Sequence, residues 1–146
     1  MYAYRLESRR VAEPDFPYFG QKLDHPQGVV DFVRGALRDS DIEKMIALYI
    51  DNHNTLIGMW VQAGTVNMVP IPLREIAKHA LLSGASAVIL VHNHPSADTI
   101  EPSAADHEVT EQCRWAMELL QIRFCDHIII GNGQSFLSFR TAGMLK

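Results

Sequence analysis

The organisation of this chain is decided by residues 87–106, which read AVILVHNHPSADTIEPSAAD. Its first five residues form an unbroken aliphatic and β-branched run, the pattern of a strand buried on both faces. Pro95 has no N–H to donate to a β-ladder, so we expect it to end the strand. From Pro102 onward the sequence has the signature of a helix start, with proline near the first position and acidic residues in the first turn. The stretch therefore predicts a buried strand, a loop and a helix.

Three side chains in this stretch are of the kinds that zinc prefers. His92 and His94 are two residues apart at the end of an extended segment, so both imidazoles point to one side while Asn93 points away. Asp106 falls in the first turn of the expected helix and faces back toward the strand. Three protein ligands leave a fourth position for water, whose pKa falls to about 7 on zinc. The pattern predicts a zinc site at the carboxyl end of the strand.

Each part of this motif also has an ordinary structural interpretation. Most histidines in proteins are satisfied by hydrogen bonds alone. Ser103 and Asp106 have the spacing of a capping box, with Asp in place of the usual Glu or Gln, so the alternative is that Asp106 serves only the helix N-terminus. The complete pattern of His-x-His-Pro, seven residues, Ser, two residues and Asp is far more specific than its parts.

The segment HNHP at residues 92–95, with Ser103 and Asp106 at this spacing, resembles the JAMM (MPN-plus) metalloprotease motif. Together with DHIIIG at 126–131 it resembles the RadC-like branch of the JAB/MPN superfamily, over roughly residues 26–140. Typical RadC members carry PSGDPTPS, whereas this chain has the longer PSADTIEPS, which is similar to the spacing of the eukaryotic isopeptidases. The resemblance therefore implies a JAMM-type metal site with an unusual loop.

The resemblance also implies the fold class, an α/β (α+β) sandwich of the MPN/JAB type. Such a fold has a cytidine-deaminase-like core in which helices flank a mixed β-sheet. We expect a JAB/MPN domain at 26–146, preceded by a strand and an irregular arm at 1–25. The helix-hairpin-helix domain of full-length RadC proteins is not expected in this chain.

Hydrophobic periodicity predicts the same order of elements, namely a helix, two strands, a helix, a strand, a helix and two strands. Besides the strand at 87–91, the expected elements are helices at 26–38, 71–82 and 102–120 and strands at 45–50, 56–62, 122–130 and 135–139.

Glu43 stands immediately before the hydrophobic strand that follows the first helix. A glutamate that follows Asp39 and Asp41 is most often a solvated charge, and that interpretation stays open. The JAMM resemblance implies instead that Glu43 is the general acid/base, since such a site needs a second carboxylate. Glu101 is the next candidate because it lies in the histidine loop.

The function implied by the resemblance is zinc-dependent hydrolysis of peptide or isopeptide bonds. His92, His94 and Asp106 would hold Zn²⁺, while Ser103 would donate a hydrogen bond to the developing oxyanion. Two alternatives come from other classes of protein. One is a non-catalytic MPN-type binding module, which the filled ligand positions disfavour. The other is a DNA-repair-associated RadC-like protein.

Composition narrows the partners of this 146-residue chain. A net charge of −4 disfavours a nucleic-acid partner, although a local basic patch stays open, and we expect a peptide or protein substrate. No apolar run reaches the ~20 residues of a membrane span, and the polar start is not a signal peptide, so we expect a cytoplasmic protein. Cys113 and Cys125 are expected to be reduced, buried thiols. The oligomeric state is not predicted.

Two further histidines lie close to the motif or to a carboxylate. His107 follows Asp106 but projects about 100° away from it on a helix, so we do not expect it to be a ligand. Asp126 and His127 together suggest catalysis. A histidine in the middle of a strand more often forms hydrogen bonds within the core, and we expect that structural role for His127.

Overall fold

The computed structural model describes residues 1, 3, 20–37, 42–63 and 72–145. Most of the strand and arm predicted at 1–25 lies outside these residues, so the boundary at residue 25 stays a prediction. The order of elements is the predicted one. The elements are α1 (Pro26–Leu37), β1 (Lys44–Ile50), β2 (Leu56–Ala63), α2 (Leu73–Ser83), β3 (Ala87–Asn93), α3 (Ala104–Leu119), β4 (Arg123–Ile130) and β5 (Phe136–Ser138).

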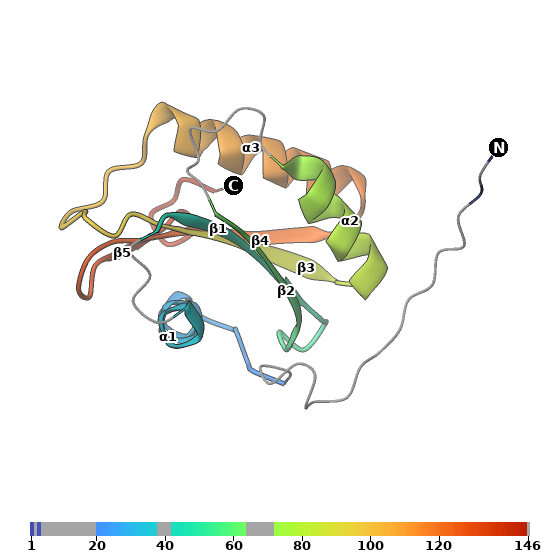
Figure 1. Cartoon of the computed structure of the whole chain (residues 1–146), viewed down its shortest axis with the longest axis horizontal. Coiled ribbons are helices and arrows are strands. Elements are labelled where there is room, and N and C mark those ends of the chain that lie inside the picture. Colours follow the sequence, from blue (N-terminus) through green and yellow to red (C-terminus); the bar gives the residue numbers. More distant parts are fainter. Residues whose placement is uncertain (2, 4–19, 38–41, 64–71, 146) are drawn as a thin grey trace.

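The strands form one mixed sheet in the order β2-β1-β3-β4-β5. Among the neighbouring pairs of described strands, β3 and β4 alone are parallel. Helix α3 connects these two strands, as a crossover between parallel strands requires. Helices α2 and α3 cover one face of the sheet, and α1 covers the other (Figure 1). The predicted fold class, a mixed sheet flanked by helices, is confirmed.

The core is divided by the sheet into two layers. Ile46, Leu48 and Val91 point toward α1, whereas Tyr49 and Leu90 point toward α2 and α3. Six of the seven side chains of β3 are buried, and that of Asn93 is partly exposed. This burial agrees with the unbroken apolar run. The central strands are therefore fixed by burial on both faces, at about 25 cal/mol for each Å² of apolar surface removed from water.

A β-bulge interrupts the pairing of β3 with β4. Val88 pairs with Phe124 and Ile89 with Asp126, so Cys125 is an extra residue on β4. One extra residue moves every later side chain of the strand to the opposite face. His127 consequently faces α3, although strict alternation from Phe124 would have turned it toward α1.

Element ends differ from the prediction by one or two residues. Strand β3 runs on to Asn93 because His92 still pairs with Met45 and the His94 N–H still donates to the Ile130 carbonyl at 2.7 Å. Helix α3 begins at Ala104, two residues later than predicted, because Ser103 is its N-cap.

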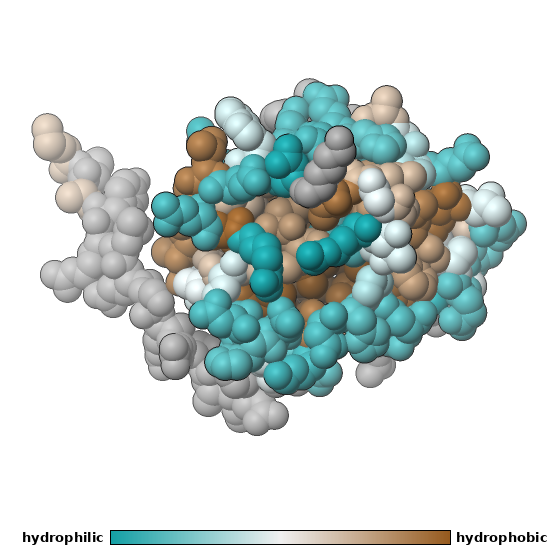
Figure 2. All heavy atoms as spheres, turned by 180° about the vertical axis from the view of Figure 1, so that it is seen from behind, coloured by the Kyte–Doolittle hydropathy of each residue, from teal (hydrophilic) through white to brown (hydrophobic). Residues whose placement is uncertain are grey.

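The surface combines ordinary polar cover with a hydrophobic area. Seen from behind, hydrophobic side chains gather in the middle of the face, between hydrophilic rims above and below (Figure 2). No helix within the described ranges has the length and apolar character needed to cross a membrane.

Candidate metal centre

Three ligand atoms converge at the carboxyl end of β3. His92 Nε2 lies 2.9 Å from His94 Nε2 and 3.3 Å from Asp106 Oδ1. Two ligand atoms of a tetrahedral zinc site with bonds of about 2.0–2.1 Å are about 3.3 Å apart. Within the described part of the chain, this is the one group of histidine, cysteine or acidic side chains whose ligand atoms cluster, all within 4.8 Å of one another. The structure thus brings together the three predicted ligands.

The carboxylate of Asp106 fits a cation at this point. Asp106 is 2% exposed, and its Oδ1 is buried without a hydrogen-bond partner among the described residues. Burial works to raise the pKa of this carboxyl, but the His92 ring when charged and the Ser103 N–H outweigh it and hold the pKa below its usual value. A buried, ionised oxygen with no donor is costly unless a cation meets it. The donor set of two imidazoles and one carboxylate is suited to zinc.

The two interpretations of Asp106 are compatible with each other, because its two oxygens face different partners. Oδ2 accepts the Ser103 N–H at 2.7 Å, and Ser103 Oγ accepts the Asp106 N–H at 3.1 Å, which completes a capping box. Oδ1 is left for the cluster. The helix cap therefore fixes the orientation of the carboxylate that faces the histidines.

The loop that carries His94 is held by the turn between β4 and β5. Asn132 N–H donates to the Ala97 carbonyl at 2.7 Å, and its side chain donates to Asp98 Oδ1 at 3.1 Å. A Cβ on Gly131 would lie 2.7 Å from the Ala97 oxygen, which explains why glycine occupies this position. The turn between β4 and β5 thus supports the loop that carries His94.

Glu43 lies at the rim of the cluster, as its place before β1 predicted. Its Oε1 is 3.5 Å from His94 Nδ1, the ring nitrogen that faces away from the other ligands, and its Oε2 is buried without a hydrogen-bond partner in the described segments. The side chain of Asn93 bonds the backbone on both sides of Glu43, at Lys44 N–H and the Ile42 carbonyl. Glu43 is therefore a fixed carboxylate and not a freely solvated one, although its catalytic role stays a prediction.

A hollow of about 240 Å³ opens beside the cluster. Its lining includes His94, Glu101, Ser103 and Asp106. The Ser103 hydroxyl, which accepts the Asp106 N–H at 3.1 Å, also lines this hollow. The geometry leaves room for a substrate group next to the predicted ligands.

His127 was not among the predicted site residues, and the structure links it directly to them. Its Nε2 lies 2.8 Å from His92 Nδ1, and its Nδ1 lies 2.6 Å from Thr110 Oγ1. Burial lowers the pKa of the His127 imidazole to about 3, with the neighbouring His92 ring as a further cause. The expected hydrogen bonding within the core is confirmed. Periodicity could not identify His92 as the partner of His127, because the bulge reverses the face of the sheet on which His127 lies.

The other histidine and the two cysteines that we did not expect to be ligands are not part of the cluster. His107 is exposed and packs its ring on Phe139, at 5.3 Å between ring centroids. Cys113 and Cys125 are buried free thiols, as expected.

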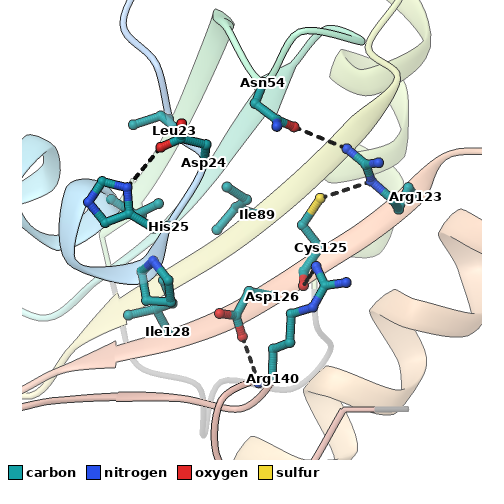
Figure 3. Close-up of a pocket in the computed structure, with 12 residues that line it drawn as sticks. Leu23, Asp24, His25, Asn54, Ile89, Arg123, Cys125, Asp126, Ile128 and Arg140 are labelled. Carbon is teal, nitrogen blue, oxygen red and sulfur yellow. Dashed lines mark hydrogen bonds and ion pairs between the residues drawn. The ribbon is translucent and has the colours of Figure 1, made fainter.

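A second hollow, of about 180 Å³, lies on the α1 side of the sheet (Figure 3). Arg123 donates to Asn54 and to the Cys125 sulfur, and Arg140 donates to the Cys125 carbonyl. Asp24 and Asp126 line the same hollow, and Asp126 accepts the Arg140 backbone N–H at 3.0 Å. It contributes nothing to the metal cluster.

Comparison with known proteins agrees with this architecture. The model of the RadC-like JAB domain matches residues 23–144. A UPF0758 protein of Rhodobacter capsulatus is 45% identical over 120 residues, covering 82% of this chain and 55% of that protein. A UPF0758 protein of Stenotrophomonas maltophilia (strain K279a) is 37% identical over 137 residues, covering 88% of this chain and 58% of that protein. The chain therefore spans somewhat more than half the length of these relatives, whose names state no activity.

Proposed function

The chain belongs to the RadC-like JAB domain family, and from that premise we propose that it is a zinc-dependent hydrolase of peptide or isopeptide bonds. One observation carries the proposal. A buried carboxylate oxygen of Asp106 has no hydrogen-bond donor within the described residues, yet lies 3.3 Å from an imidazole nitrogen that itself faces a second imidazole. A structural capping residue needs no such arrangement, since Ser103 already satisfies the other oxygen.

In the proposed reaction, His92, His94 and Asp106 would hold the metal. Zinc bound there would supply a Lewis acid for the substrate carbonyl and would lower the pKa of a water molecule to about 7. These side chains stay in place during turnover because a β-strand, a backbone-anchored loop and a helix cap hold them.

Glu43 is proposed to transfer the proton. Its carboxylate accepts one proton from the attacking water as the new C–O bond forms, and it delivers that proton to the leaving nitrogen as the C–N bond breaks. Its Oε2 is buried and has no hydrogen-bond partner among the residues that the structure describes, which supports this role because a base must keep one oxygen free for the proton. The Ser103 hydroxyl, exposed at the wall of the hollow, donates to the carbonyl oxygen as negative charge develops there.

The contact of Glu43 with His94 Nδ1 also fits a carboxylate that merely orients a ligand, and substitution separates the two roles. If Glu43 is the base, Glu43→Gln keeps the bound zinc and lowers hydrolysis at least about 100-fold, with little change in substrate affinity. If Glu43 only orients His94, zinc affinity falls as well, by about 10- to 100-fold. The assay combines zinc titration with turnover on a panel of peptides and isopeptide-linked proteins.

Glu108→Gln is the matched control, because Glu108 is an exposed glutamate of α3 that bonds only Gln112 among the contacts described. It should leave both zinc affinity and turnover at the parent values. Hydrolysis that is unchanged in zinc-loaded Glu43→Gln would refute its role, and Glu101→Gln would then be tested as the alternative base.

A further inference from the structure

A chain of buried hydrogen bonds connects the backbone of α3 to His92. The Thr110 hydroxyl donates to the Asp106 carbonyl at 2.8 Å, and the same oxygen lies 2.6 Å from His127 Nδ1. His127 Nε2 in turn lies 2.8 Å from His92 Nδ1. Thr110, His127 and His92 are at most 3% exposed, so water does not compete for these bonds. The chain ends at the ring whose other nitrogen faces the metal cluster.

With both imidazoles neutral, one arrangement of protons makes all three contacts hydrogen bonds. A carbonyl oxygen can only accept, so the single hydroxyl proton of Thr110 is committed to the Asp106 carbonyl. Thr110 Oγ1 must then accept from His127, which places a proton on His127 Nδ1. A neutral imidazole carries one proton, so His127 Nε2 accepts, and the donor in the last contact is His92 Nδ1. A neutral His92 is consequently left with a bare Nε2.

The surroundings of His127 favour this neutral form. Its ring is fully buried and stacks on Phe139, with centroids 4.8 Å apart and planes at 15°. No carboxylate oxygen bonds either of its nitrogens, since Thr110 and His92 occupy both. Complete burial of the ring disfavours an imidazolium. The β4 bulge at Cys125 is what turns this ring toward α3 and away from the α1 face.

We propose that Thr110 and His127 are positioning residues that hold the proton of His92 on Nδ1 and so present Nε2 to the metal, an inference that rests on the proposed function. Neither residue contributes a ligand atom to the cluster. Their effect is to select one tautomer and one ring orientation before the metal arrives. A ligand fixed in this way binds metal more tightly, since neither a proton nor a ring has to be moved.

The test uses a matched pair of substitutions at Thr110 in the full chain. Thr110→Val keeps the branched shape and removes the hydroxyl, so His127 Nδ1–H loses its acceptor. Its proton then moves to Nε2, where it donates to His92, and the His92 proton shifts to the ligating nitrogen. Thr110→Ser keeps the hydroxyl. We expect zinc affinity, measured by chelator competition, to fall about 10- to 100-fold in the valine variant and to be rescued in the serine variant.

The second readout needs no metal. In metal-free protein labelled with ¹⁵N-histidine, proton–nitrogen correlations distinguish protonated from bare ring nitrogens. The parent should show His92 and His127 both protonated at Nδ1, and Thr110→Val should show His92 protonated at Nε2. A purely structural role of Thr110 would shift the unfolding midpoint without changing this tautomer.

The possible failures are distinguishable. A parent that takes up no zinc contradicts the proposed function, while the tautomers of the metal-free parent still decide the inference. A parent spectrum with His92 protonated at Nε2 overturns the inference, whether or not zinc binds. Equal zinc affinity of Thr110→Val and the parent also overturns it.

Discussion

Asn93 holds the segment that carries Glu43, and replacing it with alanine should release that segment. Asn93 Oδ1 accepts the Lys44 N–H at 2.7 Å, and its Nδ2 donates to the Ile42 carbonyl at 3.2 Å. The side-chain amide thus continues the β1–β3 ladder beyond its last backbone pair, Met45 with His92. Without it, the Glu43 carboxylate is no longer fixed beside His94.

The expected loss of stability follows from the two hydrogen bonds that Asn93→Ala removes. Each contributes about 0.5–1.5 kcal/mol net, and partial exposure favours the lower half of that range. Asn93→Ala should therefore lower the free energy of unfolding by about 1–2 kcal/mol, measured by denaturant titration. Locally, the loss of about 1 kcal/mol corresponds to about fivefold faster hydrogen exchange at the Lys44 amide. Zinc affinity should change little because Asn93 itself supplies none of the three predicted ligand atoms.

Asn52 provides the matched control, since it is exposed in the turn between β1 and β2. Asn52→Ala should stay within about 0.5 kcal/mol of the parent. If Asn93→Ala matched this control in both unfolding and Lys44 exchange, the amide would not be holding the Glu43 segment, and the reasoning would be refuted.

Two further predictions concern the support of the site and the core. Gly131→Ala should lower the free energy of unfolding by about 1–3 kcal/mol and weaken zinc binding, since its Cβ would lie 2.7 Å from the Ala97 oxygen. Gly58→Ala is the control, because its Cβ would lie 3.5 Å from Tyr49 and the variant should unfold like the parent. Normal stability of Gly131→Ala would show that the hairpin does not brace the loop. Burial raises the pKa of the Cys113 thiol from 9.0 to about 12, so only about 10⁻⁴ of it is thiolate at pH 8 and iodoacetamide should not label it in the folded protein. The same shift makes the free energy of unfolding fall as pH rises above about 9, because only the unfolded chain then releases the thiol proton. Rapid labelling at pH 8, or a free energy of unfolding that is unchanged between pH 8 and pH 10, would contradict the shift.

Sequence patterns were sufficient for the elements and the ligand cluster because both depend on local rules. The buried run at 87–91 requires a strand with cover on both faces, and residues two apart in a strand share a side. The Ser103 cap and the Asp106 carboxylate follow from the spacing of one helix turn. The cluster of His92, His94 and Asp106 is therefore largely a local consequence of a strand, a loop and a helix.

The interactions of His127 could not be predicted because they depend on the bulge at Cys125. The run RFCDHIII has no glycine or other mark at that position, and strict alternation places Cys125 and His127 on one face. The bulge appears only when β4 is paired with β3. The bonds of Asn93 around Glu43 were missed for a related reason, since they join segments 49 and 51 residues apart in sequence.

The central claim, that His92, His94 and Asp106 form a zinc site, is tested most directly by the metal content of the purified protein. Parent chain and the His92→Ala/His94→Ala double variant would be loaded with zinc, dialysed and analysed by mass spectrometry, with circular dichroism as the check of folding. The account predicts one zinc per chain in the parent and essentially none in a folded double variant. Stoichiometric zinc in the double variant, or none in the parent, would contradict it.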